Sequence, residues 1–135
     1  MRYSTFALVV MSTAALAAPL MAHHSFAAEY DSKQPVTLTG AVTKIEWMNP
    51  HVYFYIDVKD EQTGRVANWA FEMGAPAVIQ RNGWTRNSMK IGDIVMVEGT
   101  RAKSGANHGN ARSVTMASTG KKLGAGSSEG QTPEQ

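Results

Sequence analysis

The segment from Trp47 to Val58, WMNPHVYFYIDV, constrains the fold more than any other part of the chain. Its second half alternates, with Val52, Phe54, Ile56 and Val58 at every second position and aromatic or polar residues between them. This period of two predicts a strand that buries one face. Pro50 lacks a backbone donor and restricts the residue before it, so the Asn49–Pro50 pair separates this strand from the one that precedes it.

Four further strands are predicted from similar patterns. Val36 to Val42 alternates with threonine and alanine, and the apolar phase then shifts, which predicts a β-bulge near Thr43–Lys44. The remaining strands are expected at about 65–73, 94–100 and 111–116, with a hairpin loop at 60–64 and a short helix from Pro76 to Arg81.

Five strands with one short helix between the third and fourth predict an all-β fold, a small five-stranded OB-like barrel. A small β-sandwich is the alternative architecture. We expect three segments: a signal peptide at 1–22, a barrel domain at 23–117 whose N-terminal arm is His23–Gln34, and a disordered Gly/Ser-rich tail at 118–135.

The first 22 residues have the pattern of a secretory signal. Arg2 precedes a short apolar core, and Ala22 is a small residue at the expected cleavage position. The apolar core is shorter than the roughly 20 residues that cross a bilayer, although a retained anchor is the alternative. We therefore expect a periplasmic protein that is not held at the membrane after cleavage.

Composition excludes several kinds of site. The chain has 135 residues, a formal net charge of +2 and no cysteine. Near-neutral charge disfavours binding to nucleic acid, and the lack of thiols excludes thiol catalysis, iron–sulfur clusters and cysteine-type zinc sites. We find no phosphate-binding loop and no nucleophile elbow, so we expect a protein that binds rather than catalyses.

The expected new amino terminus carries the strongest chemical signal. Cleavage after Ala22 exposes His23 and His24, and a terminal histidine offers its amine and imidazole to one metal ion. Cleavage one residue earlier places His23 second and His24 third, which also produces a square-planar nitrogen site. Nitrogen donors in a square plane favour Cu(II). Copper is therefore the expected ligand, with His51 as the best remote partner and His108 as a weaker one. The alternative is that these histidines are solvated and bind nothing.

Two other features have alternative interpretations. Glu72 could bind metal, but we favour a salt bridge with Arg81 or Arg86, because carboxylates near the surface usually pair or stay solvated. Tyr53 and Tyr55 could form an aromatic face that binds a small ligand or another periplasmic protein. If the helix and arm cover this face, the tyrosines contribute only to packing.

A resemblance to a known group rests on several motifs. They are His23–Asp31 (HHSFAAEYD), Trp47–His51 (WMNPH), Asn68–Gly74 (NWAFEMG), Gly83–Arg86 (GWTR), Gly92–Asp93 and Val97–Gly99. Together they resemble an uncharacterised family of small exported bacterial proteins that is filed as a domain of unknown function. The resemblance implies export and a compact β domain, and it brings no established activity. The strand order is also similar to that of bacterial periplasmic OB-fold proteins.

Overall fold

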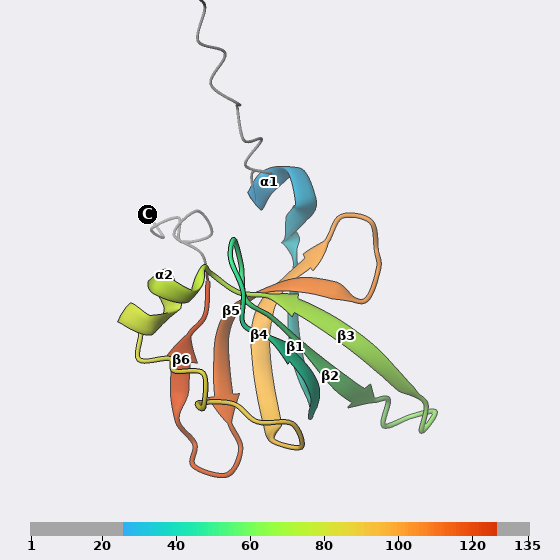
Figure 1. The fold of residues 1–135 in the computed structure, drawn as a ribbon. Coiled ribbons are helices and arrows are strands. Elements are labelled where there is room, and N and C mark those ends of the chain that lie inside the picture. Colours follow the sequence, from blue (N-terminus) through green and yellow to red (C-terminus); the bar gives the residue numbers. More distant parts are fainter. Residues whose placement is uncertain (1–25, 127–135) are drawn as a thin grey trace, which may run out of the picture.

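A computed structural model describes residues 26–126 of the chain, and the expected signal peptide, His23 and His24 lie outside this range. One sheet with two short helices makes up the described part (Figure 1). Its elements are α1 (Phe26–Glu29), β1 (Tyr30–Glu46), β2 (Tyr53–Lys59), β3 (Val66–Glu72), α2 (Pro76–Arg81), β4 (Ile94–Ala102), β5 (His108–Met116) and β6 (Lys122–Gly124). The all-β prediction is confirmed, and so is the short helix between the third and fourth strands.

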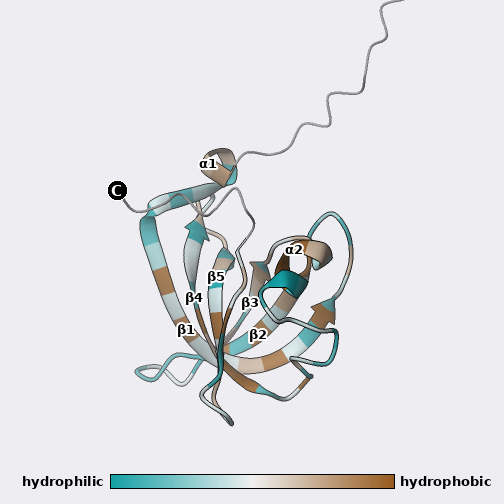
Figure 2. Ribbon diagram, turned by 90° about the vertical axis from the view of Figure 1, so that its left-hand side faces the viewer, coloured by the Kyte–Doolittle hydropathy of each residue, from teal (hydrophilic) through white to brown (hydrophobic). Residues whose placement is uncertain are grey.

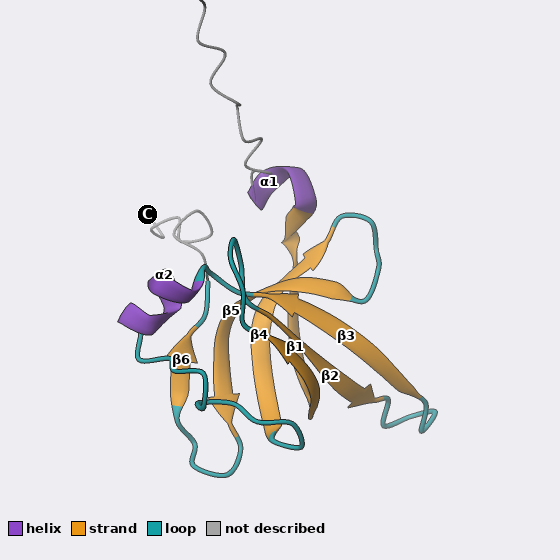
Figure 3. Cartoon of the chain, viewed as in Figure 1, coloured by secondary structure: helices purple, strands orange, loops and turns teal. Residues whose placement is uncertain are grey.

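The sheet closes into a ring. Its strand order is β3-β2-β1-β4-β5-β6, and an additional pairing joins β3 to β5 (Figure 3). That pairing is parallel, with Ala70 opposite His108 and Glu72 opposite Asn110, whereas the other pairings are antiparallel. The end of β3 therefore lies beside the start of β5. Within the described residues, no helix has the length and apolar character needed to span a membrane.

Strand β1 is long enough to pair with two neighbours. It pairs with β4 along Pro35 to Ala41 and with β2 along Ala41 to Glu46. The register shifts between Val42 and Lys44, which confirms the predicted bulge. Gly40 permits the close approach of β2 at this bend, because a Cβ there would lie 2.3 Å from the carbonyl oxygen of Asp57.

The core consists of the alternating apolar residues that face into the ring. Figure 2 shows hydrophobic and hydrophilic residues alternating along β1. Large, fully buried side chains come from each of the strands β1 to β5 and from α2, and include Phe54, Ile56, Phe71, Val97 and Ile79. Such burial contributes roughly 1.5–3 kcal/mol for each large apolar side chain.

The predicted N-terminal arm is wrong for residues 30–34. These residues belong to β1, and Tyr30 is paired with Ala102 and only 3% exposed. The polar run from Asp31 to Gln34 has the composition of a loop, but it lies on the exposed part of the strand. One buried tyrosine anchors this segment, and a single buried residue produces no period in the sequence.

The predicted disordered tail also needs correction. Residues 122–124 form β6, in which Leu123 pairs with Val114 and is 8% exposed. The indole Nε1 of Trp84 donates a hydrogen bond to the Gly124 carbonyl at 2.9 Å. The domain therefore extends past residue 117. Leu123 and the distant Trp84 together hold this Gly-rich segment in place. Residues 127–135 of that tail lie outside the described part of the chain.

Candidate metal centre

His51 lies in the loop between β1 and β2, and backbone hydrogen bonds fix this loop against the end of β3. The Val52 amide donates to the Gly74 carbonyl at 3.2 Å, and the Met73 amide donates to the Val52 carbonyl at 2.8 Å. Val52 itself is buried, which anchors the loop in the core. These contacts place the imidazole of His51 beside Glu72, the last residue of β3.

Glu72 is the centre of a side-chain cluster. It is 6% exposed, and its two carboxylate oxygens have different partners. Oε1 lies 2.5 Å from Nδ1 of His51, and Oε2 accepts a hydrogen bond from the Tyr30 hydroxyl at 2.5 Å. The predicted salt bridge with Arg81 or Arg86 is therefore wrong, because β1 and the β1–β2 loop cover this carboxylate and supply its partners.

His108, the first residue of β5, completes the other side of the cluster. Its Nε2 lies 2.9 Å from the Tyr30 hydroxyl and 4.0 Å from Oε1 of Glu29. Tyr53 is the cross-strand neighbour of Glu72, and its ring centroid lies 6.4 Å from that of His108. We call the six residues Glu29, Tyr30, His51, Tyr53, Glu72 and His108 the Glu72 cluster.

Burial further disfavours ionisation of the two tyrosines of this cluster. It raises the pKa of Tyr30 far above the usual value, and the hydrogen bond to Glu72 raises it further. Burial also raises the pKa of Tyr53, and the charge of Glu72 adds to the effect. Both hydroxyls therefore remain neutral donors at physiological pH, and Tyr30 donates its only proton to Glu72.

The hydrogen bonds of the cluster assign the histidine tautomers. His51 must carry a proton on Nδ1 to donate to Glu72, so in the neutral ring Nε2 has the free lone pair. Because the Tyr30 proton points at Glu72, the Tyr30 oxygen accepts from His108, which then carries its proton on Nε2. A histidine whose Nδ1–H is held by a carboxylate is a common arrangement for a metal ligand.

Three residues of the cluster bring potential metal-ligating atoms together. One ligand atom each from Glu29, Glu72 and His108 lie within 4.8 Å of one another. They come from the end of α1, the end of β3 and the start of β5. The β3–β5 pairing brings the last two side by side, and Glu29 at the end of α1 lies 4.0 Å from His108. Carboxylate and imidazole donors bind divalent metals such as zinc, copper and iron.

The aromatic face expected from Tyr53 and Tyr55 is divided between two environments. Tyr53 lies in the Glu72 cluster, as described above. The Tyr55 hydroxyl donates to Oε2 of Glu46 at 3.1 Å, and Nζ of Lys44 lies 5.2 Å from its ring centroid. Sequence reasoning did not find Glu29 and Tyr30 as site residues, although both lie in the HHSFAAEYD motif.

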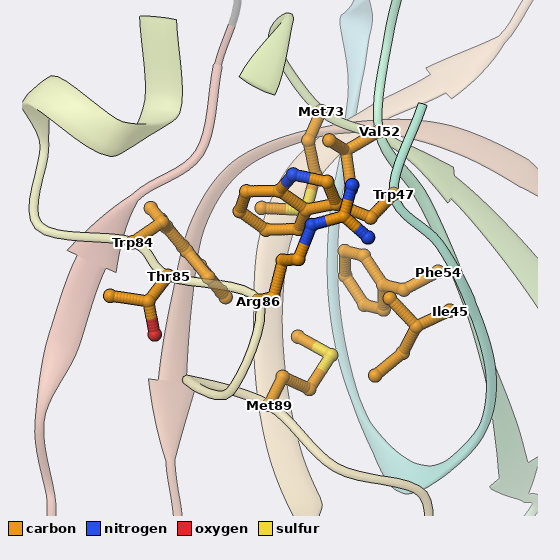
Figure 4. A pocket seen from close by; sticks show the side chains of 9 residues that line it. All are labelled: Ile45, Trp47, Val52, Phe54, Met73, Trp84, Thr85, Arg86 and Met89. Atoms are coloured by element: carbon orange, nitrogen blue, oxygen red, sulfur yellow. The ribbon is translucent and has the colours of Figure 1, made fainter. Parts of the chain in front are cut away.

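A recess lies beside the β1–β2 loop. Figure 4 shows that Arg86 lies across Trp47 at its mouth, with the guanidinium carbon 6.0 Å from the ring centroid. The remaining lining is mostly apolar and consists of Ile45, Val52, Phe54, Met73, Trp84, Thr85 and Met89. Its free volume of about 10 Å³ barely admits one water molecule. The recess therefore packs the loop that carries His51 rather than holding a ligand.

Comparison with known proteins gives one match. A family model described as "Family of unknown function (DUF6152)" matches residues 9–112, a range that contains every residue of the Glu72 cluster. No curated protein and no solved structure matches the chain.

Proposed function

Because the chain belongs to this family of unknown function, as its motifs suggested, we propose a function from its own residues: it is an exported, non-enzymatic protein that captures Cu(II). The proposed ligands are the amino-terminal His23 and His24 together with His51. One observation carries the proposal, namely that buried Glu72 holds Nδ1 of His51 at 2.5 Å. This contact fixes the ring and leaves Nε2 available to an ion.

The position of the cluster in the fold supports a binding role. We propose that the ring is an OB-like barrel, in agreement with its strand order and with the place of α2 between β3 and β4. His51 comes from the β1–β2 loop, and His108 follows the β4–β5 connection. In OB folds these two loops and the adjoining face of the second and third strands bind ligands.

The chain between His24 and the cluster is short enough for a shared site. Only Ser25 separates His24 from Phe26, whose ring lies 5.3 Å from that of Tyr30. The Lys103 amide donates to the Glu29 carbonyl at 2.9 Å and the Lys103 ammonium donates to the Ala27 carbonyl, so α1 is tied to the β4–β5 connection. Two residues span at most about 7 Å when extended, which supports a site shared by the terminus and His51.

The test is titration calorimetry with Cu(II) on protein purified after export, with its amino terminus established by mass spectrometry. We expect one Cu(II) per chain. A few extra residues before the natural terminus should abolish binding, and His51→Ala should weaken it, whereas Glu46→Gln, a carboxylate change outside the cluster, should have no effect. Affinity should fall below about pH 6.5, because imidazole must be neutral to bind. Equal affinity of the native and extended forms would refute the proposal.

The alternative function is a periplasmic accessory or protein-interaction module. The position of Tyr55 favours it, because this side chain lies on β2 outside the Glu72 cluster, half-buried beside Lys44. In that case, changing Tyr53 and Tyr55 together to alanine would abolish recovery of a partner protein. Changing Tyr55 alone would weaken recovery, and copper would affect neither result.

A further inference from the structure

We propose that Glu29, Glu72 and His108 form a second metal site, for a divalent ion of the zinc class, that needs no residue before Phe26. This donor set is separate from the amino-terminal chelate proposed above, because it uses none of its three histidines as ligands. It shares only the carboxylate of Glu72, which would orient His51 in one site and bind the ion in the other.

Three elements hold these donors in place. Glu72 is opposite Asn110 in the β3–β5 ladder, two positions along from the pair formed by Ala70 and His108. The Glu29 backbone accepts the Lys103 amide at 2.9 Å. The donors are therefore attached to hydrogen-bonded backbone rather than to free loops, which is the support that a preformed site requires.

The distances are close to those that an ion needs. A tetrahedral zinc ion with ligands at about 2.1 Å places its ligand atoms about 3.4 Å apart. Here the three atoms lie within 4.8 Å of one another, and Nε2 of His108 is 4.0 Å from Oε1 of Glu29. The Glu29 side chain is 40% exposed and can close this gap, whereas Glu72 is already fixed by His51 and Tyr30.

The donor chemistry favours the zinc class. Two carboxylates and one imidazole provide oxygen and nitrogen donors, and the chain offers no thiolate. Three protein ligands leave a fourth position for water or another ligand, as in open zinc sites. His51 would then be the outer partner that fixes Oε1 of Glu72, while Oε2 would bind the ion in place of the Tyr30 hydroxyl.

Tyr30 competes with the ion for this position. Its hydroxyl lies 2.5 Å from Oε2 of Glu72 and 2.9 Å from Nε2 of His108, two of the three proposed donors. To bind, the ion must replace the hydrogen bond that the Tyr30 hydroxyl donates to Glu72. His108 must also carry its proton on Nδ1 instead of Nε2. Removing the hydroxyl eliminates one competing hydrogen bond to a charged group, so Tyr30→Phe should bind the ion about tenfold or more tightly.

The experiment uses the full chain with His23→Ala and His24→Ala, which removes the amino-terminal copper site. Co(II) is titrated while its visible absorption is followed, and Zn(II) is then added as a competitor. We expect one Co(II) per chain, displaced by Zn(II). Glu29→Gln, Glu72→Gln and His108→Ala should each weaken binding at least tenfold, and Glu46→Gln, the same carboxylate-to-amide change outside the cluster, should not.

Several outcomes would overturn the inference. They are no Co(II) binding by the double histidine variant, undiminished binding after Glu29→Gln, and weaker binding after Tyr30→Phe. Glu29 is partly exposed, so its substitution tests the site even if Glu72→Gln fails to fold. Failure here leaves the copper proposal intact, because that proposal depends on His23 and His24, which this variant lacks.

Discussion

Tyr30→Phe tests whether the Glu72 cluster stabilises the metal-free fold. The substitution removes the hydroxyl that donates to Oε2 of Glu72, and the carboxylate is only 6% exposed. A hydrogen bond to a charged group contributes about 1.5–3 kcal/mol, and a buried acceptor left without its donor keeps the desolvation cost. We expect a loss of about 2 kcal/mol in the free energy of unfolding, or roughly 10 °C in Tm for a domain of this size.

The matched control is Tyr55→Phe. That hydroxyl also donates to a carboxylate, but its acceptor, Glu46, is 26% exposed rather than buried and is already paired with Lys44 at 2.5 Å. Its removal should change stability by no more than about 0.5 kcal/mol. Urea unfolding in the presence of a chelator measures both variants, and an unchanged m-value ensures that the midpoints can be compared.

The pH dependence of stability in the alkaline range gives a second measurement on Tyr30→Phe. Burial and Glu72 raise the pKa of Tyr30 above its unfolded value of about 10, so the stability that it contributes is complete below that pH and is lost as pH rises further. Tyr30→Phe should therefore lose less stability than the wild type above about pH 10. If Tyr30→Phe costs no more than Tyr55→Phe, or if the alkaline limbs coincide, the cluster does not hold the fold as described.

Two further predictions concern the strands outside the site. Leu123→Ala should destabilise the protein by about 2–3 kcal/mol in urea unfolding, because the side chain is buried in β6; a change near zero would show that residues 118–126 do not belong to the domain. Glu98→Gln should lose less stability than the wild type as the pH falls into the acid range. The Lys122 ammonium and the Ser113 hydroxyl lower the pKa of Glu98, so its contribution is present above the unfolded pKa and is lost as pH falls through the folded one. Identical acid limbs in wild type and variant would contradict this.

Local patterns were sufficient to predict most of the sheet. The alternation from Val52 to Val58 predicted β2, and the phase shift after Val42 predicted the bulge at its observed place. These features can be predicted from neighbouring residues, because every second residue of such a strand is buried. β6 escaped prediction because the apolar neighbour of Leu123 at that spacing is only the small Ala125. The strand is held by contacts with residues distant in the chain, since Leu123 pairs with Val114 and Trp84 donates to the Gly124 carbonyl.

Sequence reasoning selected residues of the Glu72 cluster only where the side-chain type by itself suggested a function. His51 was selected because imidazole binds metals, and Glu72 was considered but assigned to an arginine. The correct partner could not be inferred, because the parallel pairing of β3 with β5 and the burial of Tyr30 are set by ring closure. Glu29 had no distinguishing local pattern, and its relevance follows from the position of α1 beside His108.

One hydrogen bond in this cluster, from Tyr30 to Glu72, raises the stability of the metal-free protein and lowers its affinity for metal. The Tyr30 hydroxyl stabilises the metal-free protein by satisfying Glu72, and it opposes the ion because it occupies the same oxygen. An ion at about 100 times its dissociation constant stabilises the fold by about 2.7 kcal/mol, and more in Tyr30→Phe, which binds it more tightly. The difference in stability between wild type and variant should therefore shrink as Zn(II) is added. If the two unfolding midpoints moved in parallel with Zn(II), the ion and the hydroxyl would not share Glu72.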